Sequence, residues 1–388
     1  MSAEMKYHSV KDCILNNYTF ASTFLNQFSC MKNLLIIVLL GLCFTGIAQD
    51  NQFVVSGKVM DSANQQLLSG ASVFCQNTTL GTISNAEGRF SLKLPNGGYD
   101  LIVSYTGYES RVIRISNTET EPLQIQLKQK DKSLQEVAVV SSSEVADGLA
   151  KYGQFFTDNF IGNTGNGVQC KIQNPEALQF FFSKKRNRLK VKAKEDLIII
   201  NNALGYKIKF QLDSFAHEYN NSVSVYTGFP FFEELPGTED QKTAWKKNRL
   251  KAYNGSRLHF VRSWYQQNLT AEGFAIEQVD PYSTNLKTTE IENPYDTLLF
   301  KVQEDKDIEI NYNGKLRVIF KKALPDARYL AESKLPSYLK SQISILEVND
   351  GFVIQQNGYF YDQNDVTNIG YWSWLKLGDA LPYDYKPE

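Results

Sequence analysis

Two of the three histidines in this chain of 388 residues, His217 and His259, are the side chains best suited to metal or acid–base chemistry. A common zinc site combines a His-x-x-Glu pair with a distant second histidine. The third position after His217 is Asn220, and the third after His259 is Arg262. A metal site would therefore need carboxylates to complete its ligand set. We expect both histidines to be satisfied within the fold, and the sequence assigns no catalytic residue, cofactor or metal.

A tight basic cluster is the first candidate binding surface, and its charged members are Lys184, Lys185, Arg186 and Arg188. The cluster lies between two alternating segments, which predicts the tip of a hairpin. A second basic group follows at Lys246, Lys247, Arg249 and Lys251. Together they could contact phosphates of lipid headgroups or lipopolysaccharide. The alternative, which we favour, is a solvated turn.

Aromatic side chains near the end of the sequence form the second candidate surface. Tyr371, Trp372 and Trp374 could stack on a sugar ring. For the two tryptophans, packing into the core is the interpretation that we favour. The acidic run at 304–307 is predicted to be a turn at a strand end, not an acid/base pair.

Composition indicates a folded chain of two or three domains, because 42% of residues are hydrophobic and 13% are aromatic. Abundant Tyr and Phe in a turn-rich sequence favour β-structure. The net charge of −1 argues against a nucleic-acid partner bound by a whole-protein positive field. Beyond residue 48 only Cys75 and Cys170 remain, and we expect two buried free thiols rather than a disulfide.

A targeting signal lies near the start of the sequence. Residues 31–48 combine a short basic region, an apolar run too short to span a bilayer and a small-residue end, which predicts a signal peptide cleaved between Ala48 and Gln49. Residues 1–30 are then an over-extended start. A lipid anchor at Cys43 is the weaker alternative, because Leu42 precedes it. We expect an extracytoplasmic protein, in the periplasm or at the outer membrane or cell surface.

The region after the signal peptide reads as a compact β-sandwich. In residues 89–94, Phe90, Leu92 and Leu94 alternate with polar side chains, as in a half-buried strand. Gly, Asn and Pro turns separate seven such segments. They are residues 53–59, 71–75, 81–84, 89–94, 99–105, 111–115 and 123–127. The spacing predicts a seven-stranded antiparallel sandwich over 49–128.

These segments resemble the carboxypeptidase-like regulatory domain, a transthyretin-like sandwich. The resemblance is carried by Val55–Val59, Gly70–Val73, Gly81-Thr82, the turn at 85–90, Gly98-Tyr99 and Gly107-Tyr108. It implies an accessory module, found beside zinc carboxypeptidases and at the N-terminus of Bacteroidetes-type TonB-dependent receptors. The missing His-x-x-Glu pair argues against a carboxypeptidase here.

A charged and Ser-rich stretch at 129–150 is the predicted linker to a larger β-rich α+β domain at 151–388. Four strands are expected between residues 189 and 225. A Thr238/Gln241 capping box predicts a helix through Lys251, and Ser256 is the predicted cap of the next. Landmarks such as residues 170–175, 203–206, 253–260 and 370–374 resemble an uncharacterised group of Bacteroidetes-type envelope proteins.

Three functions remain open from the sequence. The first is a non-catalytic binding or scaffold protein of the cell envelope, whose partner is an envelope protein or a glycan and which contacts the outer membrane peripherally. The second is an envelope hydrolase acting on peptide or glycan. The third is a carbohydrate-binding accessory protein. A pocket with two convergent carboxylates, or a histidine with two acids, would favour the hydrolase.

Overall fold

The computed structural model describes residues 52–116, 121–130, 144–283, 287–304, 306–361 and 366–388. Residues 52–388 form one compact unit, and all that follows concerns this unit. The predicted over-extended start, the signal peptide with its cleavage site at Ala48 and Gln49, and positions 131–143 of the predicted linker lie outside the described residues. Among the helices that are described, none is both long and apolar enough to cross a membrane.

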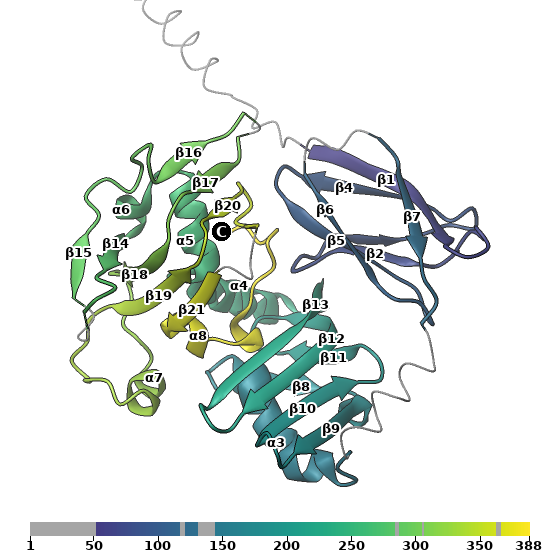
Figure 1. The fold of residues 1–388 in the computed structure, drawn as a ribbon, viewed down its shortest axis with the longest axis horizontal. Coiled ribbons are helices and arrows are strands. Elements are labelled where there is room, and N and C mark those ends of the chain that lie inside the picture. Colours follow the sequence, from purple (N-terminus) through teal and green to yellow (C-terminus); the bar gives the residue numbers. More distant parts are fainter. Residues whose placement is uncertain (1–51, 117–120, 131–143, 284–286, 305, 362–365) are drawn as a thin grey trace, which may run out of the picture. The chain divides into compact units, whose positions relative to one another are not determined.

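A β-sandwich of seven strands opens this unit (Figure 1). One sheet has the order β4-β1-β7 and the other β3-β2-β5-β6. The strands are β1 (Gln52–Asp61), β2 (Ser72–Cys75), β3 (Gly81–Ile83), β4 (Arg89–Pro95), β5 (Tyr99–Ser104), β6 (Arg111–Ile115) and β7 (Leu123–Leu127). The predicted alternation in β4 is confirmed, because Phe90, Leu92 and Leu94 are buried in the core between the sheets.

One pairing in the sandwich differs from the predicted antiparallel pattern. β1 pairs antiparallel with β4 but parallel with β7, where Gly57 lies opposite Leu123. The strand before β7 belongs to the other sheet, so the chain crosses between sheets instead of turning in a hairpin, and a crossover permits a parallel pair. A Cβ at Gly57 would lie 2.4 Å from the Leu123 carbonyl oxygen, which explains the glycine at this close approach.

A six-stranded sheet follows the sandwich and carries helix α3 (Gly148–Phe160). Its strands are β8 (Cys170–Ile172), β9 (Leu178–Ser183), β10 (Arg188–Ala193), β11 (Leu197–Asn201), β12 (Tyr206–Glu218) and β13 (Val223–Glu234). The long β12 pairs along one edge with β13 and along the other with β11 and then β10. Phe156 and Phe160 of α3 pack into the core of this sheet. The strands expected between residues 189 and 225 are present in an antiparallel sheet, although β10 pairs with β12 and not with its neighbour in sequence, β11.

The remaining chain forms two further antiparallel sheets and a set of short helices. The sheets have the orders β15-β14-β18-β19-β21 and β16-β17-β20. The strands are β14 (Phe274–Val279), β15 (Thr288–Glu290), β16 (Phe300–Val302), β17 (Ile308–Ile310), β18 (Gly314–Phe320), β19 (Gln342–Val348), β20 (Phe352–Ile354) and β21 (Val366–Gly370). The α-helices are α4 (Glu239–Tyr253), α5 (Arg257–Tyr265), α6 (Leu269–Glu272), α7 (Ala327–Glu332) and α8 (Tyr371–Trp374). Short 3-10 turns in the described residues include η1 (Gly167–Gln169) and η2 (Pro175–Ala177) beside the six-stranded sheet and η4 (Leu377–Asp379) after α8.

Both predicted helix caps are present. The Thr238 side chain accepts a hydrogen bond from the backbone of Gln241, whose own side chain bonds back to the Thr238 backbone. The Ser256 hydroxyl accepts the backbone N–H of His259 at the start of α5. The bonds at both caps satisfy N–H groups that a helix start leaves without partners.

Backbone hydrogen bonds join the sandwich to the rest of the unit. The Asn77 N–H donates to Pro230 O at 2.8 Å, and the Phe232 N–H donates to Thr78 O at 2.9 Å, so a sandwich loop pairs with β13. The Tyr383 N–H donates to Asn77 O at 2.6 Å. A side chain adds to these backbone bonds: Asn357 Nδ2 donates to Gly98 O at 2.9 Å. The sandwich is therefore held through several segments that lie far apart in sequence.

Candidate functional site

The predicted basic cluster lies at the turn between β9 and β10, and these two strands pair as the sequence indicated. Lys184, Lys185 and Arg186 are exposed. Arg188 begins β10 and forms an ion pair with Glu218, with 2.8 Å between Nε and Oε1. Three of the four cations therefore face solvent, and the fourth is committed to a partner across the sheet.

The three aromatic candidates lie at α8, on a different element from the basic cluster. Tyr371 and Trp372 are buried, and the Trp372 indole N–H donates to Gly255 O at 2.7 Å. Trp374 is half-buried and its indole N–H donates to Glu332 Oε2 at 2.7 Å. The Trp372 ring belongs to the core, whereas Trp374 keeps part of its surface accessible.

Both histidines are satisfied by neighbours. His217 Nδ1 lies 2.8 Å from the Ser224 hydroxyl, and burial lowers the pKa of its imidazole. His259 Nδ1 lies 3.1 Å from the backbone nitrogen of Gly255, and Nε2 lies 3.2 Å from Glu272 Oε2.

The tautomer of His259 follows from these contacts. A backbone N–H can only donate, so Nδ1 is the acceptor and Nε2 carries the proton toward Glu272. Burial lowers the pKa of the ring. No cluster of three or more metal-binding side chains occurs in the part of the chain that the structure describes.

The two cysteines are free, as predicted. Cys75 is buried within the sandwich, whereas Cys170 is half-buried. Burial raises the pKa of the Cys75 thiol and raises that of Cys170 to about 12. Both are therefore protonated near neutral pH, and neither resembles a nucleophilic thiolate.

A cavity of about 650 Å³, which we call the sandwich-side cavity, lies where the sandwich meets the rest of the unit. The sandwich contributes Gln76 and Asn77, β13 contributes residues 226–230, and α5 contributes its cap and first turn. The segment from Trp372 to Tyr383 completes the wall. Sequence reasoning did not find this site, because its walls come from segments that are distant along the chain.

Charged side chains enter the sandwich-side cavity from two elements. Arg257, at the start of α5, and Lys376, just after α8, both line it. Lys376 Nζ donates to Ser373 O at 2.6 Å, and removal from water lowers the pKa of this lysine. Neither cation forms an ion pair with a carboxylate among the described residues.

Two aspartates also border the sandwich-side cavity, and each is bonded locally. Asp379 accepts hydrogen bonds from the Thr164 hydroxyl at 2.9 and 3.1 Å and from Asn166 Nδ2 at 3.0 Å. Burial raises the pKa of Asp379 to about 6, although these bonds oppose the rise. Asp213 Oδ2 accepts the Thr227 hydroxyl at 2.9 Å.

A second cavity of about 760 Å³, the lysine-side cavity, shares Ser256 and Asp379 with the first. Its rim carries the exposed lysines Lys247, Lys251 and Lys322. Its wall includes Tyr371, Trp374, His259, Glu272, Asp326 and Gln342. Gln342 is only 8% exposed, and its Oε1 has no hydrogen-bond partner among the described residues. A buried acceptor of this kind favours a donor from a bound molecule or a water.

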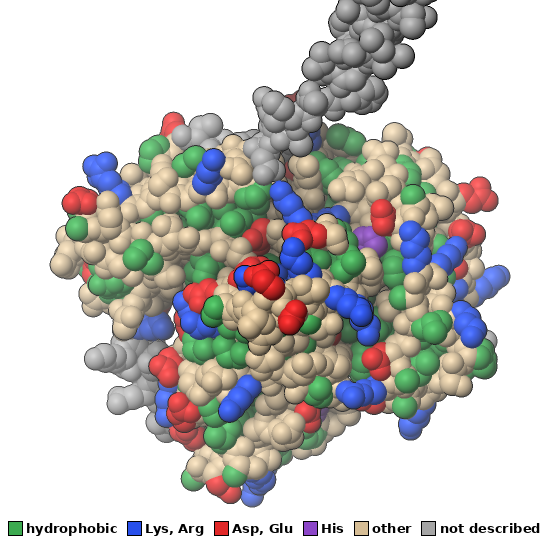
Figure 2. Space-filling model, turned by 180° about the vertical axis from the view of Figure 1, so that it is seen from behind, with side chains coloured by type: hydrophobic (Ala, Val, Ile, Leu, Met, Phe, Trp, Pro, Cys, Tyr) green, Lys and Arg blue, Asp and Glu red, His purple; other side chains and the backbone are tan. Residues whose placement is uncertain are grey.

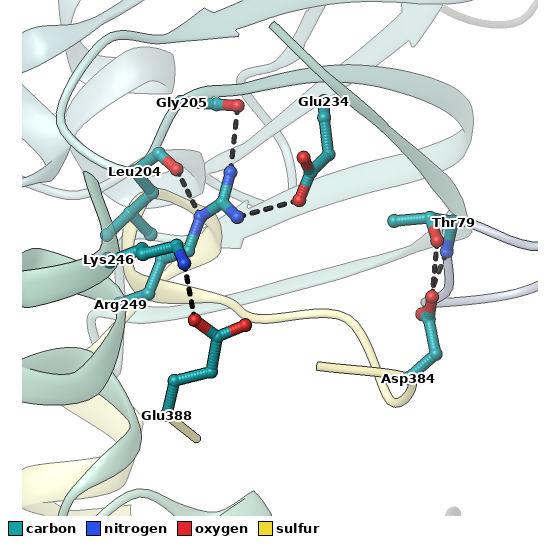
Figure 3. Close-up of polar contacts among 8 residues, drawn as sticks. All are labelled: Thr79, Leu204, Gly205, Glu234, Lys246, Arg249, Asp384 and Glu388. Carbon is teal, nitrogen blue, oxygen red and sulfur yellow. Dashed lines mark hydrogen bonds and ion pairs between the residues drawn. The ribbon is translucent and has the colours of Figure 1, made fainter. Parts of the chain in front are cut away.

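A third, smaller cavity of about 390 Å³ is lined in part by Arg249. Figure 3 shows the polar contacts of this arginine. The buried Arg249 donates to Leu204 O at 2.7 Å, Gly205 O at 3.2 Å and Glu234 Oε1 at 2.7 Å. These bonds engage all three nitrogens of the guanidinium with protein acceptors, which explains its burial.

The last residues of the sequence are fastened at two points in the same view. Asp384 accepts bonds from the backbone and hydroxyl of Thr79 in the sandwich, and Lys246 pairs with Glu388 (Figure 3). Both pairs fix the segment that follows the sandwich-side cavity, so its wall is held from the sandwich and from α4.

Charges of both signs are interspersed on the face shown in Figure 2, and the described residues there form no broad patch of one sign. The net charge of −1 agrees with this distribution. Recognition of a charged molecule would therefore rest on local cations in a cavity and not on a general field over this face.

Comparison with known proteins identifies the sandwich. Residues 55–139 match the CarboxypepD_reg-like domain. TonB-dependent receptor SusC of Bacteroides thetaiotaomicron is 28% identical over 115 residues, which are 30% of this chain and 11% of the receptor. A TonB-dependent receptor of Formosa agariphila is 31% identical over 109 residues, 28% of this chain and 10% of the receptor.

The chain thus spans about a tenth of the length of these curated relatives. Among solved structures, a mutant catechol 1,2 dioxygenase of Acinetobacter radioresistens covers 23% of this chain and 55% of its own, with 10% identity and a TM-score of 0.18. That score is too low to relate the two folds. The resemblance seen in the sequence is confirmed: the chain carries a CarboxypepD_reg-like domain at residues 55–139.

Proposed function

We propose that this protein is a non-catalytic, extracytoplasmic binding protein of the cell envelope, in which the CarboxypepD_reg-like sandwich forms one wall of a ligand cavity. Two TonB-dependent receptors of Bacteroides and Formosa are its partial relatives, which supports an envelope location. The sequence at residues 31–48 supports export.

The observation that carries the proposal is the joint construction of the sandwich-side cavity. Gln76 and Asn77 of the sandwich face the same space as Arg257 of α5 and Tyr383 of the last segment. Backbone bonds of Asn77 to Pro230 and Tyr383 hold this wall in place. A volume of about 650 Å³ suits a small molecule, and such pockets commonly form where structural parts meet.

The contacts of the acids and histidines favour binding over hydrolysis. His259 and Glu272 lie in the wall of the lysine-side cavity with Asp326 and Asp379, which is the combination that a hydrolase would need. However, both ring nitrogens of His259 have partners. Asp326 caps α7, and Asp379 bonds to Thr164 and Asn166. A general base must reach the substrate proton, and these groups are directed at protein partners instead.

A tryptophan placed in the cavity wall tests the proposed function. Thr227 is an exposed residue of β13 that lines the sandwich-side cavity, so Thr227→Trp should fill it. Val225 lies two residues earlier on the same strand face, is 58% exposed and is outside the cavity wall, so Val225→Trp is the matched control.

Native mass spectrometry would compare wild type and both variants after incubation with a small-molecule extract of envelopes. We expect wild type and Val225→Trp to retain a bound compound that Thr227→Trp loses. If wild type retains nothing, or if all three proteins retain the same compounds equally, the cavity is not a binding site.

A carbohydrate-binding function is the second candidate, and the lysine-side cavity favours it. Trp374 and Tyr371 lie in its wall, with 5.7 Å between the ring centroids, and the unpartnered Gln342 Oε1 is nearby in the same wall. Aromatic faces and buried amide acceptors suit the CH and OH groups of a sugar. Titration with neutral disaccharides should give binding that Trp374→Ala and Gln342→Leu weaken. Equal titration curves for wild type and both variants would remove this candidate.

A further inference from the structure

Two cations face the sandwich-side cavity without a counter-ion. The guanidinium of Arg257 lies 5.0 Å from the centroid of the Phe360 ring. Its charge opposes the rise in pKa that burial causes at Tyr226 and Tyr383, which places it close to two tyrosines of the cavity wall. Lys376, just after α8, contributes the second positive charge.

Both cations are half-buried, and neither has an ion pair among the described residues. Lysine and arginine removed from water normally pair with a carboxylate. The two aspartates at this cavity accept hydrogen bonds from threonine and asparagine side chains, and neither lies within ion-pair distance of Arg257 or Lys376. Partial removal from water lowers the pKa of Lys376, and no carboxylate opposes this shift.

Neutral groups of the wall complete the chemistry. Ser256, Arg257 and Leu258, the cap and first turn of the nine-residue α5, line the cavity, so the positive end of the helix dipole adds to the two cations. Asn368 Oδ1 is buried without a partner among the described residues. The half-buried Asn77 also lines the cavity. A bound molecule would thus meet positive charge together with neutral donors and acceptors.

We propose that the sandwich-side cavity binds a small molecule through its carboxylate or phosphate group, with Arg257 and Lys376 as the anion-binding residues and Asn77 of the sandwich as a further contact. This inference rests on the proposed binding function and names its ligand class. Carboxylates and phosphates share the need for cationic donors, and arginine binds either with paired N–H groups.

Calorimetric titration of the full chain with inorganic phosphate, glucuronate and glucose tests the ligand class and separates its two sources. We expect phosphate or glucuronate to bind and glucose not to bind. Arg257→Gln and Lys376→Gln should each weaken anion binding by about tenfold or more, the usual effect of removing a charge-assisted hydrogen bond. Arg186→Gln, at the exposed β9–β10 turn, should leave binding unchanged and serves as the control.

Thermal unfolding of each variant would show that it is folded, and Arg257→Lys, which keeps the charge, should retain part of the affinity. Failure of both anions to bind, equal affinity of wild type and the two glutamine variants, or equal binding of glucose would overturn the inference. A neutral envelope compound lost only in Thr227→Trp would refute the anionic class while the binding function stands. Equal retention by Thr227→Trp and Val225→Trp would refute the binding function itself.

Discussion

Asp379 offers a quantitative test of how the two cavities are built, because this half-buried residue lines both of them. Burial raises its pKa from 3.8 to about 6, despite bonds from Thr164 and Asn166. A rise of this size corresponds to about 3 kcal/mol between the two protonation states. Replacing Asp379 with asparagine removes the ionisation while keeping the side chain's shape.

The sign of the effect follows from the two pKa values. Between 3.8 and about 6 the folded protein binds a proton at Asp379 that the unfolded chain has released, so this group's contribution to stability is fully present below 3.8 and is lost as the pH rises through about 6. The stability of Asp379→Asn relative to wild type should therefore increase by about 3 kcal/mol over this pH range.

Urea unfolding followed by tryptophan fluorescence, at a series of pH values, measures this difference. Asp350→Asn, at an exposed position in the turn between β19 and β20, is the control and should show no such trend. If the stability of Asp379→Asn relative to wild type stays constant or decreases as the pH rises, the carboxylate is not removed from water at the place where the two cavities share it.

Three further predictions concern the framework around the cavities. Arg249→Met should lower the free energy of unfolding by about 2 kcal/mol or more, because it leaves the buried Leu204 carbonyl without a donor, whereas the Gly205 carbonyl keeps the bond from Leu235. Lys246→Met removes only an exposed pair and should lower it by less than about 1 kcal/mol; urea unfolding compares the two variants. Gly205→Ala should lower the free energy of unfolding by more than about 2 kcal/mol, because φ is +69° and the added Cβ would lie 2.2 Å from an atom of the Trp245 indole ring. Gly107→Ala, at φ +86° in open space, should lower it by about 1 kcal/mol. An NMR titration should find His259 as the Nε2-protonated neutral tautomer with a pKa below 6.5. The contribution of this histidine to the free energy of unfolding is then present above pH 6.5 and is lost as the pH falls. A pKa above 6.5 would contradict the assigned contacts.

The sandwich was predictable because its strands are short, alternate in polarity and are separated by glycine and asparagine turns. A second kind of local signal, the hydroxyl side chains that cap helix starts, identified the caps at Thr238 and Ser256. The parallel pairing of β1 with β7 was not predictable, because alternation gives the faces of a strand but not the direction of its partner.

Helix α3 left little trace in the sequence. Asp147 precedes it without a side-chain capping bond, its first turn carries no acidic residue, and it begins with Gly148. These features weaken the signals by which a helix start is recognised. The packing of Phe156 and Phe160 against the sheet, which stabilises the helix, becomes visible only in the folded structure.

The sandwich-side cavity depends on contacts between residues at opposite ends of the sequence. Thr79 and Asp384, which fasten its outer segment, are 305 positions apart. Sequence patterns pointed to exposed clusters such as Lys184–Arg188, where charges are adjacent in the chain. Arg257 and Lys376 carry single charges in otherwise apolar or mixed segments, so no local pattern distinguishes them.

A crystal structure of the full chain grown with phosphate or glucuronate tests the central claim most directly. We predict an anion bound in the sandwich-side cavity, within hydrogen-bond distance of Arg257 and Lys376 and in contact with Asn77 of the sandwich. An anion bound only on the exposed Lys184–Arg188 turn, or a cavity that holds only water at concentrations that saturate binding in solution, would contradict the account.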